Sequence, residues 1–400
     1  MNNFPVSYLN SNDGSGILAF GEGERFSMNE NSKLQDLQQF INEHPGKYIF
    51  GYLSYDLKEQ IHQIPSKNPD HLKFPEAYFW VPKHVVRLHN ENIAFLQGPK
   101  DAECYNFINS FLEEETDQNF HHNATQFKPR ISKEAYIQKV IQLKEHIQLG
   151  DIYEVNFCQE FYAENVDLNF HLDTYFKLNA ITKAPFSTFL KFDEFAVFCG
   201  SPERFLRKKG NKLDSQPIKG TAPRSKDKNE DDLWKQQLEN DPKERAENVM
   251  IVDLVRNDLS RIAVKDSVKV DELCAIYSFE TVHQMISSIS CEISENVSFT
   301  DVLKATFPMG SMTGAPKIRA MELIEAHESF KRGLYSGSIG YISPNGDFDF
   351  NVVIRTLLYN NKEKYLSCSV GGAITIQSDP EKEYAECMVK VKRILDGMNA

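Results

Sequence analysis

The first hundred positions alternate short apolar runs with turn residues, which is the pattern of a β-rich segment. Residues 48–55 and 77–81 are rich in aromatic and β-branched side chains, and we expect a strand at each. The polar stretch 113–128 carries acidic residues and histidines without apolar periodicity. Such a stretch is typical of an exposed linker. We therefore expect an N-terminal subdomain over residues 1–120 and a larger domain over residues 130–400.

The pattern changes after Pro129, where apolar residues begin to recur at helical spacing. Ser132 is suited to cap a helix that buries Tyr136 and Val140 and ends at Gly150. Further elements are expected in this order: strands at 152–162, 186–192 and 195–200, a polar loop at 224–232, helices near 242–262 and 316–328, strands near 337–343, 350–359 and 365–370, and a last helix at 380–397. Hairpin-paired strands flanked by helices indicate an α+β fold rather than a doubly wound sheet.

Composition narrows the range of partners. The 45 Lys and Arg residues stand against 57 Asp and Glu residues, which gives a net charge of −12 and a pI near 5.5. An acidic surface repels nucleic-acid phosphates and anionic lipids. We find no signal segment and no run near the roughly 18 apolar residues of a membrane helix. The seven cysteines are scattered without a C-x-x-C pair. We therefore expect a cytoplasmic protein with no nucleic-acid or membrane partner.

Two segments each begin a helix and present a pair of glutamates. One starts at Asp241 and the other at Asp379, each with Asp as N-cap and Pro at the first helical position. Residues at i and i+3 share one helix face, so the pairs are Glu244 with Glu247 and Glu383 with Glu386. If the two faces meet, the four carboxylates need a cation between them, and oxygen ligands suit magnesium. A simple preference of acidic residues for the helix dipole is the alternative.

Glycine-rich turns and an apolar-flanked cation are candidates for binding an anion. Phe307–Lys317 is a glycine-rich turn before a helix, and amides at a helix start bind anions. The Walker A ending is missing, and an ordinary connecting turn is an equal alternative. Arg355 lies in an expected apolar strand and needs a carboxylate, from the protein or from a substrate. Gly371 and Gly372 allow close approach of the backbone to whatever lies in the site.

Lys219 stands between turn residues in the segment Pro217–Gly220. A lysine in a loop is ordinarily solvated, whereas a desolvated lysine can act as a nucleophile. The local sequence leaves both alternatives open.

Seven segments occur together in a fixed order. They are Gly51–Asp56, Gly150–Asn156, Ser201–Phe205, Pro217–Thr221, Glu244–Asp258, Phe307–Arg319 and Asp379–Glu386. In this order they resemble the chorismate-utilising enzymes, which include anthranilate, aminodeoxychorismate, isochorismate and salicylate synthases. The resemblance covers about residues 130–395. It implies an α/β sandwich of two antiparallel sheets with outer helices and an active site in the cleft between them.

The resemblance also implies roles for individual residues. Magnesium is the implied cofactor, with Glu247 and Glu386 as ligands and Glu244 and Glu383 assisting through water. Chorismate is the implied substrate. The residues implied to bind or convert it are Thr221, Ser311, Tyr335, Arg355, Gly371 and Gly372 as binding groups, Glu203 as general acid/base, Lys219 as nucleophile, and His283 near the substrate. For His283, a satisfied core histidine is an equal alternative.

The branch of the family depends on Lys219. Aminodeoxychorismate synthases commonly have lysine at this position and anthranilate synthases usually have alanine, so the resemblance implies the aminodeoxychorismate synthase branch, component I, in folate synthesis. In that branch the lysine is thought to attack the chorismate ring while the hydroxyl leaves, and ammonia then displaces the lysine. Anthranilate synthase component I and a non-catalytic chorismate-binding regulator are the alternatives.

Two further features concern the nucleophile. The family commonly has glutamine where Glu154 stands, and isochorismate and salicylate synthases have a lysine base there. The absence of that lysine argues against water as the nucleophile, but it gives Glu154 no role. No Gly-x-Cys-x-Gly nucleophile turn surrounds any cysteine. Ammonia is therefore expected from a separate glutamine amidotransferase subunit or from solution.

Overall fold

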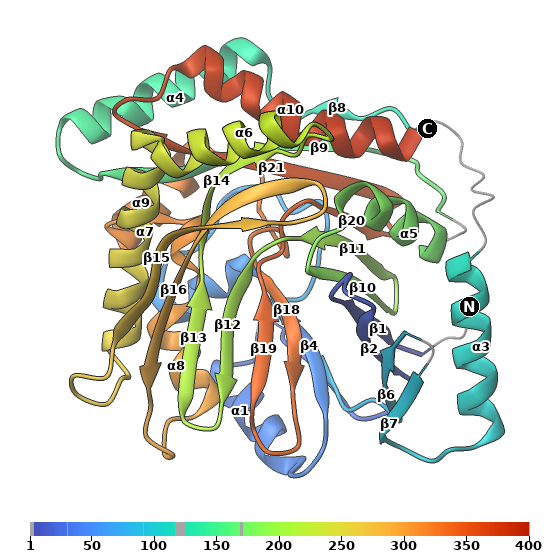
Figure 1. Ribbon diagram of the computed structural model, residues 1–400. Coiled ribbons are helices and arrows are strands. Elements are labelled where there is room, and N and C mark those ends of the chain that lie inside the picture. The colour runs from blue at the N-terminus through green and yellow to red at the C-terminus, as the bar shows by residue number, and fades with distance from the viewer. Residues whose placement is uncertain (1–3, 30, 91, 117–124, 169–170, 400) are drawn as a thin grey trace.

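Two antiparallel β-sheets form the layers of the protein, and helices lie against their outer faces (Figure 1). The computed structural model describes residues 4–29, 31–90, 92–116, 125–168 and 171–399. The first sheet has eleven strands in the order β17 (Gly314–Ala315), β9 (Glu154–Ala163), β21 (Tyr365–Thr375), β20 (Thr356–Asn360), β11 (Phe195–Ser201), β10 (Phe186–Phe192), β1 (Val6–Asn10), β2 (Ser15–Phe20), β6 (His84–His89) and β7 (Asn92–Gln97), with β8 (Lys128–Pro129) beside β9. This arrangement confirms the fold class predicted from the sequence.

The second sheet has ten strands. Their order is β14 (Ile218–Pro223), β16 (Val282–Glu292), β13 (Lys212–Gln216), β12 (Arg204–Lys209), β19 (Phe348–Asn351), β18 (Ser338–Ile342), β4 (Ile49–Leu53), β5 (Ala77–Trp80) and β3 (Arg25–Ser27), with β15 (Lys269–Ser278) beside β16. The described helices are α1 (Leu34–Glu43), α2 (Lys58–His62), α3 (Ala102–Thr116), α4 (Lys133–Gln148), α5 (His171–Thr182), α6 (Lys228–Asn240), α7 (Pro242–Ser260), α8 (Phe299–Thr306), α9 (Lys317–His327) and α10 (Pro380–Asn399), with 3-10 turns η1 (Tyr55–Leu57) and η2 (Gly310–Met312).

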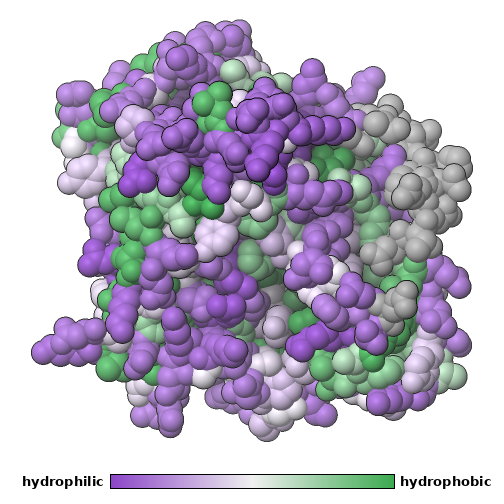
Figure 2. Space-filling model, in the orientation of Figure 1, coloured by the Kyte–Doolittle hydropathy of each residue, from purple (hydrophilic) through white to green (hydrophobic). Residues whose placement is uncertain are grey.

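Alternation along the strands divides the core into two layers. On β11, Val197 and Cys199 join the cluster shared with the second sheet, whereas Ala196 and Phe198 join the cluster under α3, α4, α5 and α10. Successive strand residues face opposite sides of a sheet, so this central strand is apolar on both faces. Figure 2 shows the outer surface on one side of the molecule, where hydrophilic residues dominate and hydrophobic residues form small separate groups. No described helix is long and apolar enough to cross a membrane.

The N-terminal residues do not form sheets of their own. Strand β1 pairs with β10, where Val6 lies opposite Lys191, and β4 pairs with β18, where Leu53 lies opposite Ser338. Strands of the expected subdomain 1–120 therefore extend both sheets of the rest of the chain. The expected linker falls partly on residues 117–124, which lie outside the described residues.

Most predicted elements are confirmed, and two differ. Ser132 caps α4 by accepting a hydrogen bond from the backbone amide of Ala135. The expected loop at 224–232 instead contains the start of α6, where the side chain of Asp227 accepts from the amide of Glu230. The expected strand at 350–359 is interrupted between β19 and β20, because the backbone at Arg355 adopts a left-handed conformation with φ of 52°.

A buried ion pair fixes β9 to the turn that carries η2. The side chains of Arg332 and Glu328 meet at 2.6 Å, and each is 1% exposed. Arg332 also donates to the carbonyls of Asn156 and Met312, both at 2.8 Å. Glu328 accepts from the amide of Cys158 at 2.9 Å. The pair thereby holds two segments that are far apart in sequence and that both reach the cleft between the sheets.

We expect Arg332→Met to lower the free energy of unfolding by about 3–5 kcal/mol, because it leaves Glu328 buried without its partner. The control is Lys304→Met, which breaks a pair with Asp301 in which both side chains are about half exposed, and we expect a loss of at most about 1 kcal/mol there. Unfolding in urea measures the free energy lost in each of the two variants. Equal, small losses would show that the buried pair does not anchor these segments.

Candidate active site

A cavity of about 550 Å³ lies in the cleft and is lined by residues of both sheets and of α7 and α10. A volume of this size is typical of a small-molecule site. The structure brings twelve of the predicted site residues to its lining: Glu203, Lys219, Thr221, Glu244, Glu247, Ser311, Tyr335, Arg355, Gly371, Gly372, Glu383 and Glu386. They come from segments that are up to 183 residues apart, from Glu203 to Glu386.

His283 is the one predicted site residue that does not line this cavity. It is 1% exposed on β16, and its ring nitrogens lie 2.8 Å from the Ser278 hydroxyl and 3.0 Å from an Asp231 carboxylate oxygen. Its strand neighbours Val282 and Gln284 face the cavity instead. Because strand residues alternate in direction, the His283 side chain is turned away. The core-histidine alternative is the one that fits this placement, and we assign His283 no contact with a substrate.

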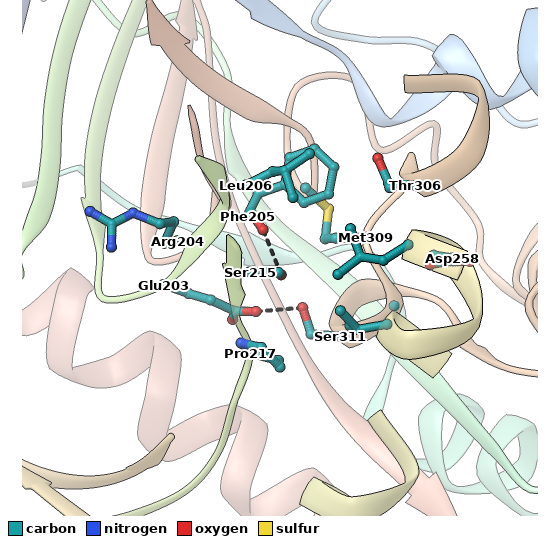
Figure 3. A pocket seen from close by; sticks show the side chains of 13 residues that line it. Glu203, Arg204, Phe205, Leu206, Ser215, Pro217, Asp258, Thr306, Met309 and Ser311 are labelled. Atoms are coloured by element: carbon teal, nitrogen blue, oxygen red, sulfur yellow. Dashed lines mark hydrogen bonds between the residues drawn. The ribbon is translucent and has the colours of Figure 1, made fainter. Parts of the chain in front are cut away.

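Glu203 is a buried carboxyl that faces the cavity. It lies between β11 and β12, is 5% exposed, and accepts a 2.6 Å hydrogen bond from the Ser311 hydroxyl, as Figure 3 shows. Burial raises the pKa of Glu203 to about 7, although the bond from Ser311 and the charge of Lys219 oppose this rise. A carboxyl that remains partly protonated near neutral pH is suited to donate a proton to a leaving group.

Lys219 enters the cavity from β14 with its side chain 10% exposed. Its Nζ donates a 2.7 Å hydrogen bond to Oε1 of Glu154, which lies on β9 in the other sheet and is 1% exposed. The next residue, Gly220, has φ of 87°, and a side chain there would press on Glu244. Lys219 is therefore neither a solvated loop lysine nor free of partners. It is a buried cation paired across the cleft.

The two glutamate pairs line one cavity, so the two helix faces meet, which their spacing had left open. The Nζ of Lys243 stands 3.8 Å from Glu247 Oε1 and 3.6 Å from Glu383 Oε1, so an ammonium lies between α7 and α10. Oε1 of Glu247 is buried and accepts no hydrogen bond from the described residues. Burial raises the pKa of Glu247 to about 7, against the charge of Lys219. The cluster therefore contains a buried carboxylate oxygen on α7 that no hydrogen bond from the described residues satisfies.

These carboxylates fit a magnesium ion that keeps part of its water shell. Among the described residues, only His84, Asp101 and Glu103, outside this cavity, bring three acidic or histidine ligand atoms within 4.8 Å of one another. The four cavity glutamates are therefore spread too widely for all to bind one ion directly. Magnesium commonly takes one or two carboxylates and fills its remaining positions with water and substrate oxygens. The unsatisfied oxygen of Glu247 offers one such ligand.

Two arginines, Arg355 and Arg393, add positive charge to the cavity lining. The guanidinium of Arg355 makes no hydrogen bond or ion pair with any residue that the structure describes, although its backbone carbonyl accepts from the amide of Gly200. Burial and the neighbouring Arg393 together lower the pKa of Arg355 to about 10, although the charge of Glu203 opposes this fall. Arg355 is half-buried and Arg393 is exposed, and two neighbouring cations of this kind favour an anion between them. The sequence predicted a carboxylate partner for Arg355, and the protein supplies none at ion-pair distance among the described residues.

Close backbone packing at β21 also borders the cavity. A Cβ at Gly371 would lie 2.4 Å from the Cys158 sulfur, so only glycine lets β21 approach β9 here. A Cβ at Gly372 would lie 3.5 Å from a Glu383 oxygen. The phenol of Tyr335 is buried and lies 3.9 Å from the same Cys158 sulfur.

Three cations of the lining were missed in the sequence: Lys243, Lys390 and Arg393. Their signal was present, because residues at i, i+4 and i+7 share a helix face. Glu386, Lys390 and Arg393 have this spacing on α10, and Lys390 lies 2.8 Å from Glu386.

The fold and its charged cleft define the class of protein. The crystal structure of anthranilate synthase component I from Streptococcus pneumoniae TIGR4 matches 95% of this chain and 92% of its own, with a TM-score of 0.81 and 27% identity. The model of the family described as chorismate binding enzyme matches residues 6–396. The chain belongs to the chorismate binding enzyme family.

Two relatives represent different named activities. The chain is 37% identical over 351 residues to aminodeoxychorismate synthase component 1 of Escherichia coli (strain K12), which covers 86% of this chain and 75% of the relative. It is 32% identical over 373 residues to anthranilate synthase component 1 of Aquifex aeolicus (strain VF5), which covers 87% and 73%. The family is thus established, while the choice between activities depends on the site.

We expect Glu247→Gln and Glu386→Gln to weaken magnesium binding at least about tenfold, since each removes a negative ligand oxygen. Glu381→Gln is the matched control, because Glu381 lies one turn away on α10, is 63% exposed and pairs with Lys133. Calorimetric titration of magnesium in the presence of chorismate measures the affinity of all three variants. Equal affinity in all three variants would contradict the assignment.

Proposed function

We infer that this protein converts chorismate and ammonia into 4-amino-4-deoxychorismate, the precursor of p-aminobenzoate in folate synthesis. The observation that carries this inference is Lys219, whose Nζ lies in the cavity beside a buried carboxyl, Glu203. The named relatives include the Escherichia coli aminodeoxychorismate synthase component 1 at 37% identity. A lysine at this position supports the same branch of the family.

The proposed reaction exchanges a ring hydroxyl for an amino group in two displacements. Lys219 Nζ, as the free amine, forms a bond to the chorismate ring while the hydroxyl leaves. Glu203 gives the departing hydroxyl its proton, so that water is released. Ammonia then forms the new C–N bond and the bond to Lys219 breaks. The added amine loses a proton, which restores Glu203, and the net change is ammonia in and water out.

The unpartnered guanidinium of Arg355 and the glutamate cluster of α7 and α10 support a substrate with two carboxylates. We propose that Arg355, Tyr335 and nearby amides hold one carboxylate, where the arginine has no protein partner. We propose that Glu247 and Glu386 hold a magnesium ion for the other, with Glu244 and Glu383 assisting through water. When bound, the ion would supply positive charge that draws electron density towards the substrate carboxylate. With both of its carboxylates bound in this way, the substrate is held with its ring in front of Lys219.

Ammonia needs a source outside this chain. The relative's printed name, component 1, agrees with the existence of a second subunit. We propose a glutamine amidotransferase subunit as the partner, with ammonium in solution as a substitute. A cytoplasmic location belongs to the same proposal, supported by the scattered, unpaired cysteines.

Anthranilate synthesis is the second candidate. It is favoured by the Aquifex aeolicus relative and by the Streptococcus pneumoniae structure, both named for that activity. It uses the same substrate and a similar ammonia donor. Lys219 discriminates between the two, because a buried amine in the cavity has a role in the lysine-displacement route and none in direct attack by ammonia.

With chorismate, magnesium and excess ammonium, we expect the purified protein to release 4-amino-4-deoxychorismate, identified by mass. Lys219→Ala should lose this product or turn over to anthranilate, because the displaced amine is gone. Anthranilate from the unaltered protein would establish the second candidate instead.

We expect turnover to fall as pH rises through about 7, because Glu203 must be protonated to serve as the acid. With a pKa of about 7, kcat should be about tenfold lower near pH 8 than near pH 6. Ser311→Ala removes a hydrogen bond that lowers this pKa, so the fall should move to higher pH. Rate profiles of both proteins test this, and a fall that stays in place or moves to lower pH would contradict the role of Glu203.

A further inference from the structure

Lys219 has one hydrogen-bond partner among the residues that the structure describes, and it is a carboxylate of the opposite sheet. The Nζ–Oε1 distance to Glu154 is 2.7 Å. The two side chains are 10% and 1% exposed, so bulk water reaches the pair poorly. Glu154 does not itself line the cavity and lies behind Lys219. A substrate in the cavity would therefore meet the lysine, and the lysine would meet the glutamate.

The lysine is held as an ammonium, which has no lone pair with which to attack. Burial lowers the pKa of Lys219, but Glu154 and, beyond it, Glu247 and Glu203 raise it more, so that the net pKa is raised. The charged groups that act on Lys219 from the surrounding elements are Glu154 on β9, Glu247, Glu244 and Glu386 on α7 and α10, and Glu203 after β11. A nucleophilic role for Lys219 therefore requires a base that takes its proton.

Glu154 is placed rigidly for that task. Its backbone lies in the interior of the first sheet, where it pairs with Ala315 of β17 on one side and with Thr375 of β21 on the other. Its second oxygen, Oε2, is buried and has no hydrogen-bond partner among the described residues. A buried carboxylate oxygen without a partner is costly, and the cost is removed when the carboxylate becomes neutral.

The other nearby carboxylates are engaged elsewhere. Glu203 accepts from Ser311 and is the proposed acid, so it cannot also serve as the base in the same step. Glu247 lies within ion-pair distance of Lys243 on its own helix. Among the described residues, Glu154 alone has an oxygen within hydrogen-bond reach of Nζ.

We propose that Glu154 is the proton acceptor that converts Lys219 into the attacking amine, a role that rests on the proposed function. The proton passes from Nζ to Oε1, which leaves a neutral amine and a neutral carboxyl. The amine forms the C–N bond as the ring hydroxyl departs with the proton of Glu203. When ammonia displaces the lysine, the released amine takes its proton back from Glu154. Transfer over 2.7 Å removes two buried charges at once, which a poorly hydrated site favours.

The test compares Glu154→Gln with the unaltered protein, with chorismate, magnesium and ammonium, over a range of pH. Glutamine keeps the shape but accepts no proton, so kcat at neutral pH should fall about 100-fold, with the KM for chorismate changed little. The ratio of the two kcat values should shrink as pH rises, because hydroxide then deprotonates Lys219 without help. Glu154→Asp keeps a carboxylate and should recover at least part of the rate. This second variant also tests the role of Glu154 if the glutamine variant folds poorly.

Asp151→Asn is the matched control. Asp151 lies three residues before Glu154 and pairs with His146 and Arg319 outside the cavity, and its loss should leave kcat unchanged. If the unaltered protein makes 4-amino-4-deoxychorismate and Glu154→Gln retains its rate and pH profile, Glu154 is not the acceptor. If the unaltered protein makes no such product, the proposed function itself fails. A rate loss in Glu154→Gln that is constant with pH and not relieved by aspartate would reduce Glu154 to a packing role.

Discussion

The cleft of this protein is organised around one buried ion pair that joins its two sheets. Lys219 belongs to β14 of the second sheet and Glu154 to β9 of the first, and their charged atoms meet at 2.7 Å. Neither charge is stable in such a place without the other. The pair therefore constrains how far the sheets can separate, and it sets a reactive amine at a fixed point of the cavity.

The acidic and the basic side chains of the cavity lining form separate groups, and each group has its own function. Glu203 is made a weak acid by burial, and burial likewise raises the pKa of Glu247, which lies with Glu383 beside Lys243. Arg355 and Arg393 are neighbours in the same lining, and Arg355 has no protein carboxylate at ion-pair distance among the described residues. An anionic substrate completes the balance. The Arg332–Glu328 pair behind the cavity keeps β9 and the η2 turn in the positions that this balance requires.

Features with a local cause were predictable from the sequence. The caps at Ser132 and Asp241 and the i, i+3 glutamates predicted α4, α7 and one face of the cavity. Features set by long-range packing were not. Helix α6 buries only Leu238 among its residues, so its apolar period is too weak to predict it. The run before Arg355 is apolar, yet the left-handed backbone there divides it into two strands in different sheets. The Lys219–Glu154 contact joins positions 65 residues apart, and no local pattern encodes it.

The central claim is that the Lys219 amine bonds to the substrate ring, and the most direct measurement is the mass of the protein during reaction. The protein is mixed with chorismate and magnesium without ammonia, quenched, and its intact mass and peptides are determined. The account predicts an added mass of chorismate less water, located on Lys219 and lost when ammonium is added before quenching. Product formation from ammonium with no such adduct, or an adduct on another residue, would contradict it.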